Sequence, residues 1–205
     1  MEMTSVISAF VTMFVVIDPI GLAPIFIALT HGMTPAQRRR TGWTAVVIAA
    51  ALLTLFGLAG EAILAGIGIS LPAFRIAGGV LLFLTALDML FERRTERRED
   101  KAADDAPGHD PSVFPLATPL LAGPGALASM ILLVNEDGSA LHTLMIHGVM
   151  LAVLAVAATL FAVAGGIARM LGRIGTMVLT RLFGMLLAAL SIQFVIDGLK
   201  GSGLF

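Results

Sequence analysis

The chain contains no cysteine, so disulfide bonds, thiol chemistry and cysteine-ligated metal sites are excluded. Its two neighbouring histidines, His142 and His147, lie five positions apart, a spacing that separates their side chains on a helix. The chain also lacks an H-E-x-x-H motif, a glycine-rich loop of the phosphate-binding kind and a convincing serine–histidine pair. We therefore expect no enzyme, no metal site and no other cofactor.

Charge is scarce as well. Of 205 residues 13% are charged and 58% are hydrophobic, whereas a soluble domain has about a quarter charged residues. The mean hydropathy is +0.96. This composition predicts an integral membrane protein. The basic residues gather in loops, without the aromatic-interleaved stripe of a nucleic-acid-binding protein. The N-terminus MEMTS is acidic and precedes no small-residue cleavage site, so we expect no signal peptide to be removed.

A helix that spans a bilayer needs about 20 apolar residues. Six segments meet this requirement, at residues 5–30, 43–66, 72–91, 113–134, 143–166 and 178–199. The fold class is therefore all-α and polytopic. The loops after the first, third and fifth segments, with the start of the sixth, hold eleven of the thirteen lysines and arginines. The positive-inside rule then predicts a multi-pass protein of the bacterial inner membrane with both termini in the periplasm.

The first segment is interrupted in the middle, where residues 14–30 read FVVIDPIGLAPIFIALT. Pro19 and Pro24 each remove a backbone N–H and restrict the residue before them, and Gly21 relaxes the backbone between them. We expect a helix to stop here and to restart with Pro24 at its first position. An interrupted backbone at membrane depth is tolerated only inside protein or beside a water-filled cavity, so the interruption predicts a cavity.

A similar interruption recurs one hundred residues later. Residues 118–124 read TPLLAGP against DPIGLAP at 18–24, so that Pro119 and Pro124 match the first two prolines. A hydrophilic linker, 92–112, separates a three-helix repeat at 1–91 from another at 113–205. Because three is odd, the second repeat must enter the membrane from the opposite side. The third and sixth helices also align, Arg75 with Arg181, Gly78 with Gly184 and Thr85 with Ser191. We therefore expect two inverted repeats with broken first and fourth helices.

Inverted repeats with broken helices are typical of secondary transporters that bind substrate near the bilayer midplane. Restarting half-helices present positive dipole ends and unpaired N–H groups, which suit a carboxylate. Ending half-helices present carbonyl groups, which suit an ammonium group or a cation. A small zwitterion fits both. The candidate binding residues are Asp18, Pro19, Gly21 and Ala23 in the first interruption, and Thr118, Pro119, Gly123 and Gly125 in the second.

Asp18 breaks the symmetry, since its counterpart is Thr118. An ionisable group within a membrane segment is a functional candidate. Three roles stay open for its carboxylate. It binds the substrate ammonium, it carries a coupling proton, or it only caps N–H groups of the local turn.

The stretches FVVIDPIGLAPIFIALT and LATPLLAGPGALASMI, with the RRR between them, resemble the signatures of the MarC family of bacterial inner-membrane proteins. The resemblance covers essentially the whole chain and implies kinship with LysE-type exporters, whose proline-glycine-proline break is similar to AGPG here. It implies a transporter, in the outward direction, of small neutral amino acids such as glycine and alanine. Relatives often carry asparagine where this chain has Leu22.

The partners expected on this reading are a small neutral amino acid, a coupling proton or sodium ion, and the bilayer, but no nucleic acid. A homo-oligomer is left open. The alternative is a non-transporting scaffold, or a membrane protein associated with stress or antibiotic resistance.

Overall fold

The computed structural model describes the backbone of residues 3–91 and 111–203, and every regular element in these two stretches is helical. The elements are α1 (Met3–Ile17), α2 (Pro19–Leu29), α3 (Pro35–Gly66), α4 (Leu71–Leu90), the π-helix η1 (Ser112–Leu121), α6 (Pro124–Val134) and α7 (Ala140–Gly201). The linker expected at 92–112 lies almost wholly outside the described residues, as do its five basic side chains. The side chains of Arg169 and Arg173 also lie outside the description.

The described helices divide into membrane spans much as the hydropathy pattern predicts. Five stretches are long and apolar enough to cross a bilayer, at Ser5–Leu29, Pro35–Gly66, Leu71–Leu90, Ala140–Ala164 and Met177–Gly201. A sixth span results if η1 and α6, which meet at an angle of 54°, are counted together. The chain is therefore an all-helical protein with five to six candidate spans.

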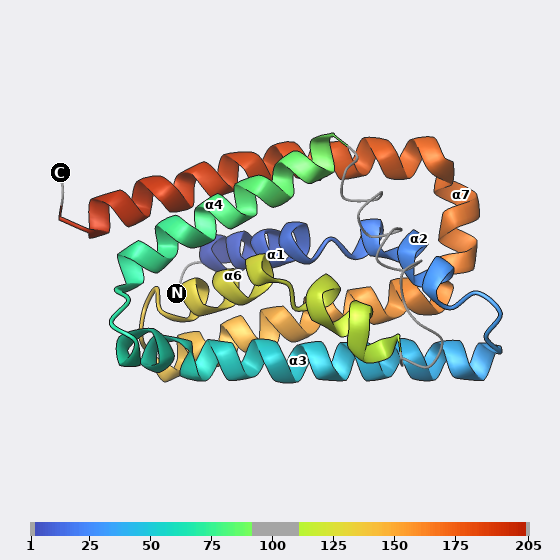
Figure 1. Ribbon diagram of the computed structural model, residues 1–205, viewed down its shortest axis with the longest axis horizontal. Coiled ribbons are helices and arrows are strands. Elements are labelled where there is room, and N and C mark those ends of the chain that lie inside the picture. Colours follow the sequence, from blue (N-terminus) through green and yellow to red (C-terminus); the bar gives the residue numbers. More distant parts are fainter. Residues whose placement is uncertain (1–2, 92–110, 204–205) are drawn as a thin grey trace.

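Two boundaries differ from the sequence expectation. The second span begins at Pro35 rather than at residue 43, because Thr34 and Gln37 form a capping box and Pro35 occupies the first helical position. The triplet Arg38–Arg40 therefore belongs to α3 and not to a loop. The fifth and sixth spans are parts of one helix, α7, which bends back on itself (Figure 1). The stretch between them contains no proline that would force the helix to end.

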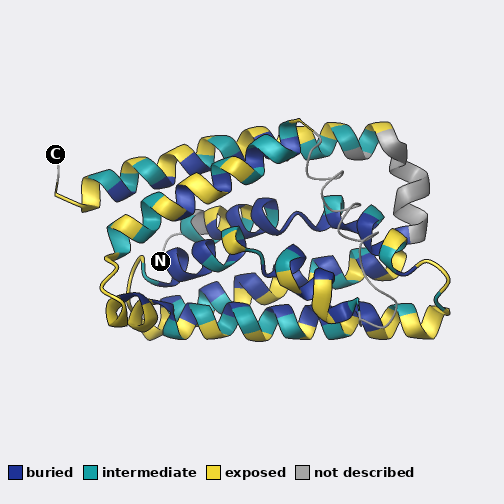
Figure 2. Cartoon of the chain, in the orientation of Figure 1, coloured by how far each residue is buried: buried dark blue, intermediate teal, exposed yellow. Residues whose placement is uncertain are grey.

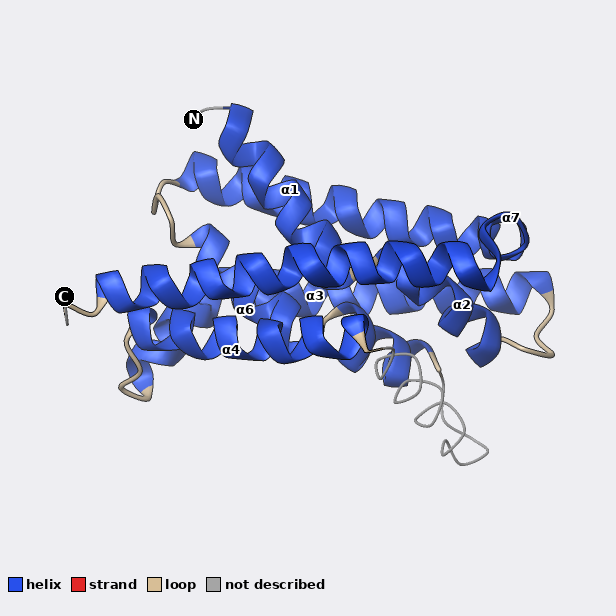
Figure 3. Ribbon diagram, turned by 90° about the horizontal axis from the view of Figure 1, so that it is seen from above, coloured by secondary structure: helices blue, strands red, loops and turns tan. Residues whose placement is uncertain are grey.

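The bundle has two distinct ends. Both termini, the α3–α4 loop and the α6–α7 loop lie at one end, and the α2–α3 loop and the bend of α7 lie at the other (Figure 1). We call these the terminal end and the bend end. Seen from a perpendicular direction, α3, α4 and the two long arms of α7 run roughly along the same axis (Figure 3).

The interrupted segments occupy the interior. Of the most apolar part of Ser5–Leu29, 61% of the residues are buried, against 28% for Leu71–Leu90 and 22% for Met177–Gly201. In α6 the run from Ala128 to Val134 is buried throughout. Large apolar side chains on α3, α4 and α7 are exposed instead (Figure 2). The uninterrupted helices thus present an apolar surface suited to lipid and shield the interrupted ones.

Glycines bring α4 close to the C-terminal arm of α7. A Cβ atom added to Gly79 would lie 2.7 Å from the backbone oxygen of Ser191, and one added to Gly198 would lie 2.9 Å from that of Pro72. These pairs show that the two helices run antiparallel. In lipid, where apolar side chains gain nothing by leaving water, such close backbone approach is a main source of helix association.

The remaining contacts follow a reciprocal pattern. Helix α3 of the first half packs against η1 and α6 of the second half, and α7 of the second half packs against α1 and α2 of the first. The stacked rings of Phe26 in α2 and Phe161 in α7, 4.5 Å apart between centroids, belong to the second of these contacts.

The close approach of α4 and α7 can be tested at Gly79. In Gly79→Ala the new methyl group overlaps the Ser191 backbone oxygen, so we expect a loss of about 1–3 kcal/mol in the free energy of unfolding. Gly148→Ala is the matched control, because a Cβ atom at Gly148 of α7 meets nothing within 4 Å. Thermal unfolding in detergent measures both variants, and equal stabilities would contradict the packing described.

Candidate functional site

The first interruption is a single residue, Asp18, between α1 and α2. Its backbone is left-handed, with φ 54° and ψ 60°, a conformation that aspartate tolerates better than most residues. The backbone ladder continues across it, since Asp18 N–H donates to the Phe14 oxygen at 2.9 Å and the Asp18 oxygen accepts from Leu22 at 3.0 Å. The helix is therefore interrupted without leaving these backbone groups unpaired.

The restart position differs from the sequence expectation. The half-helix begins at Pro19, and Pro24 lies inside α2. Pro19 already meets the requirement of the first helical position, where a missing N–H has no helical partner to lose. Because Asp18 takes the left-handed conformation, the helix resumes at once and includes Pro24.

The Asp18 side chain caps this restart. The side chain is buried, 1% exposed, and its Oδ1 accepts a hydrogen bond from the Gly21 N–H at 3.0 Å. A Cβ atom on Gly21 would fall on the same carboxylate, so a larger residue at this position would displace the cap. The capping role is thus observed, and it does not exclude contact with a substrate.

The second interruption is built differently. In η1 the hydrogen bonds span five residues, as between Ala122 N–H and the Ala117 oxygen at 2.9 Å. Phe114 and Thr118 are extended inside it, each directly before a proline, the placement in which proline disfavours the helical region. After an extended Gly123, α6 begins at Pro124, and no side chain caps it.

The start of α6 packs tightly. A Cβ atom on Gly123 would lie 2.6 Å from the Pro119 backbone oxygen, and one on Gly125 would lie 2.8 Å from Leu82 and 3.5 Å from Val16. Val16 is only two residues before Asp18. The two interruptions therefore approach each other where α6 begins and α1 ends, near the middle of the bundle (Figure 1).

The predicted site residues differ in their surroundings. Asp18, Pro19 and Ala23 are buried, Gly21, Pro119, Gly123 and Gly125 are partly buried, and Thr118 is exposed. Thr118 thus does not share the environment of Asp18, although the two align in sequence. Whether these residues bind a substrate stays a prediction.

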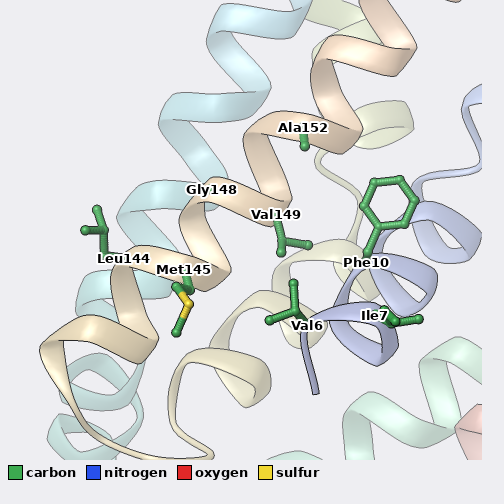
Figure 4. A pocket seen from close by; sticks show the side chains of 8 residues that line it. All are labelled: Val6, Ile7, Phe10, Leu144, Met145, Gly148, Val149 and Ala152. Carbon is green, nitrogen blue, oxygen red and sulfur yellow. The ribbon is translucent and has the colours of Figure 1, made fainter. Parts of the chain in front are cut away.

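An open groove with a volume of about 620 Å³ lies among the described residues (Figure 4). Its lining is apolar and comes from α1 and the start of α7: Val6, Ile7, Phe10, Leu144, Met145, Gly148, Val149 and Ala152. It does not include the interruptions, so the cavity expected beside Asp18 stays a prediction.

Three buried polar side-chain atoms have no hydrogen-bond partner among the described residues. They are Arg38 Nε in α3, Ser129 Oγ in α6 and His147 Nε2 in α7. The sequence signal for His147 is an ionisable side chain inside an apolar segment.

Comparison with known proteins gives a consistent picture. The model of the MarC family integral membrane protein matches residues 3–202. The UPF0056 membrane protein MJ1677 of Methanocaldococcus jannaschii is 36% identical over 98% of this chain and 99% of its own length. The UPF0056 membrane protein YhcE of Escherichia coli is also 36% identical, over 94% of this chain and 90% of its own length. No solved structure matches the chain.

The cap at Asp18 is testable by stability. Asp18→Ala removes the acceptor for the Gly21 N–H, a loss of about 1–2 kcal/mol in the free energy of unfolding. Asp18→Asn keeps an acceptor oxygen and tolerates the left-handed backbone, so it should unfold close to wild type. Thermal unfolding in detergent compares the two. If the asparagine variant is as unstable as the alanine variant, then the charge rather than the cap stabilises the turn.

Proposed function

The chain belongs to the MarC family of integral membrane proteins, and from that premise we propose that it is a secondary transporter that exports small neutral amino acids such as glycine and alanine. The substrate binds between the two interrupted segments near the middle of the membrane. A proton, or a sodium ion, drives the transport. The protein spans the cytoplasmic membrane with both termini outside.

One observation carries the proposal, the unequal capping of two half-helices whose first residues approach the middle of the bundle. The N-terminus of α2 carries the Asp18 carboxylate, whereas no side chain caps the N-terminus of α6. The dipole of α6 therefore leaves a positive end without an acidic side chain to cap it. A zwitterion complements this arrangement, with its carboxylate at the start of α6 and its ammonium group beside Asp18.

The packing around these ends supports a small substrate. Val16, Leu82 and Gly125 are in close contact, and Leu22 and Ala23 beside the other interruption are buried. A large side chain on the substrate has no space there, which suits glycine and alanine.

The reciprocal contacts support an inverted repeat. Exchanging the two halves turns the contact of α3 with η1 and α6 into that of α7 with α1 and α2. The same exchange maps the pair of α4 and the last arm of α7 onto itself. Two halves that rock against each other around a central site are the usual basis of alternating access.

Close packing also favours a second candidate, a non-transporting membrane scaffold. Asp18, Leu22 and Ala23 are almost fully buried, as expected if the interruptions were only packing features. Transport measurements separate the two functions.

The decisive experiment uses purified protein in proteoliposomes. Vesicles loaded with unlabelled alanine should take up labelled alanine by exchange, and glycine should compete, whereas leucine should not. Asp18→Asn should weaken alanine binding severely if the charge holds the ammonium group. If the charge carries the proton instead, exchange persists and pH-driven accumulation is lost. The absence of amino-acid exchange in the wild type would favour the scaffold.

The orientation is tested with single cysteines, since the native chain has none. Ser202→Cys, at the terminal end, should react with a membrane-impermeant maleimide in intact cells. Ala36→Cys, next to the arginines at the start of α3, should react only after the membrane is opened. Both positions are exposed. Labelling of both from outside would contradict the proposed topology.

A further inference from the structure

His147 holds a proton on a defined nitrogen. It lies in the span Ala140–Ala164, and its Nδ1 is 2.7 Å from the Thr143 backbone oxygen. A carbonyl oxygen can only accept, so Nδ1 must carry the hydrogen. A neutral imidazole has one N–H, and therefore Nε2 is left with a bare lone pair.

That lone pair has no partner within the described part of the chain, and the atom is shielded from solvent. It lies against the backbone of α3 at Gly57, where an added Cβ atom would be 3.1 Å from Nε2 and 2.9 Å from Met130 Cε. An acceptor buried without a hydrogen bond is costly, and an apolar side chain would fill the same space without that cost.

The other histidine of α7, His142, has an acceptor near each of its ring nitrogens. His142 is 2% exposed, its Nε2 lies 2.8 Å from the Leu133 backbone oxygen, and its Nδ1 lies 4.0 Å from an Asp137 carboxylate oxygen. Both of its nitrogens face acceptors. The two histidines therefore differ in kind, and only His147 combines a fixed Nδ1–H with an empty Nε2.

The position of His147 connects the terminal end with the second interruption. It lies seven residues into α7, about 10 Å from the start of that helix at the terminal end. Met130, which lies against Gly57 as His147 does, is six residues into α6, about 9 Å from the interruption at Pro124. His147 is thus placed part of the way between external water and the proposed substrate position.

We propose that Nε2 of His147 is a proton-binding position of the transport cycle. A proton from water at the terminal end adds to the Nε2 lone pair without breaking any bond, and the Nδ1–H bond to Thr143 persists. The same proton returns to water when Nε2 becomes accessible from the bend end. This assignment rests on the proposed function for its link to transport, but proton binding itself is measurable separately.

Other titratable groups lie nearby and must be separated from His147. Thr143 and Gly57, which lie against His147, and Met130, which also lies against Gly57, do not titrate. α1 carries no titratable side chain over its described residues. Glu61 follows Gly57 by one turn of α3, and Glu136 and Asp137 follow α6. Burial raises the pKa of the Glu136 carboxyl, Arg75 and then His142 lower it, and Asp197 adds to the rise.

Proton binding is tested by nitrogen NMR on ¹⁵N-histidine-labelled protein in lipid nanodiscs. The His147 signals are those that vanish in His147→Asn, whose amide retains a donor where Nδ1 lies. On acidification the Nε2 signal should move from an unprotonated to a protonated position, while Nδ1 stays protonated throughout. An Nε2 signal that acidification does not change overturns the proposal.

Transport tests the link to function in the same protein. In His147→Asn, pH-driven accumulation of alanine should fall to the level of empty vesicles, while exchange continues. Gly57→Ala leaves the histidine intact but places a methyl group against Nε2, and it should impair accumulation in the same way. His31→Asn, exposed between α2 and α3, and Gly66→Ala, with nothing within 4 Å, are the matched controls.

The outcomes separate the two proposals. Accumulation at the wild-type level in His147→Asn overturns the role of His147 in transport, and loss of exchange together with accumulation assigns it a structural role instead. If the wild type itself moves no amino acid, then the proposed function fails, and the NMR titration alone decides whether His147 binds a proton.

Discussion

The structure depends on one constraint, that every backbone N–H and C=O group of a chain in lipid needs a partner. At Asp18 the chain meets it with a single left-handed residue, both of whose backbone groups stay bonded, and with a carboxylate that takes the Gly21 N–H. At the second interruption, the five-residue spacing of η1 carries the bonds past two prolines. Such segments are safest in the interior, so the uninterrupted α3, α4 and α7 face outward. The layering of the bundle follows from where its prolines lie.

Hydropathy predicted the spans well, because the bilayer fixes how long an apolar segment must be. It did not predict where helices begin. The sequence carries the capping signals of Thr34, Pro35 and Gln37, but the arginines after them are equally typical of a loop. The basic residues near 169–173, at the bend of α7, are also typical of a loop. Charge reports the side of the membrane, whereas caps and prolines report where a helix starts, and the two signals need not coincide.

The candidate site was predictable in outline and not in detail. Two matching proline pairs indicated two interruptions, but no local rule selects between Pro19 and Pro24 as the restart, because the choice depends on the conformation of Asp18. The sequence alignment of the two interruptions pairs Thr118 with Asp18. The one-residue break buries the Asp18 side chain, whereas the longer π-helix leaves the Thr118 side chain exposed. The sequence marks His147 only as an ionisable residue inside an apolar segment. Its distinguishing feature is the unpaired Nε2 lone pair opposite Gly57. This feature arises only where α3, α6 and α7 pack together, so the sequence alone does not reveal it.

The departures from symmetry are what give the proposed site its chemistry. Two identical interruptions in an inverted repeat would direct two positive helix ends at the centre, an arrangement suited to a doubly negative ligand. Asp18 offsets one of these ends and leaves the other uncapped. A ligand that is neutral overall, but carries one charge of each sign, then fits better than either an anion or a cation. The same reasoning suits the proposed proton-binding role of His147. Its uncharged Nε2 can gain and lose a positive charge while the ligand remains neutral. Proton coupling and selectivity for a zwitterion are thus compatible within the same helix bundle.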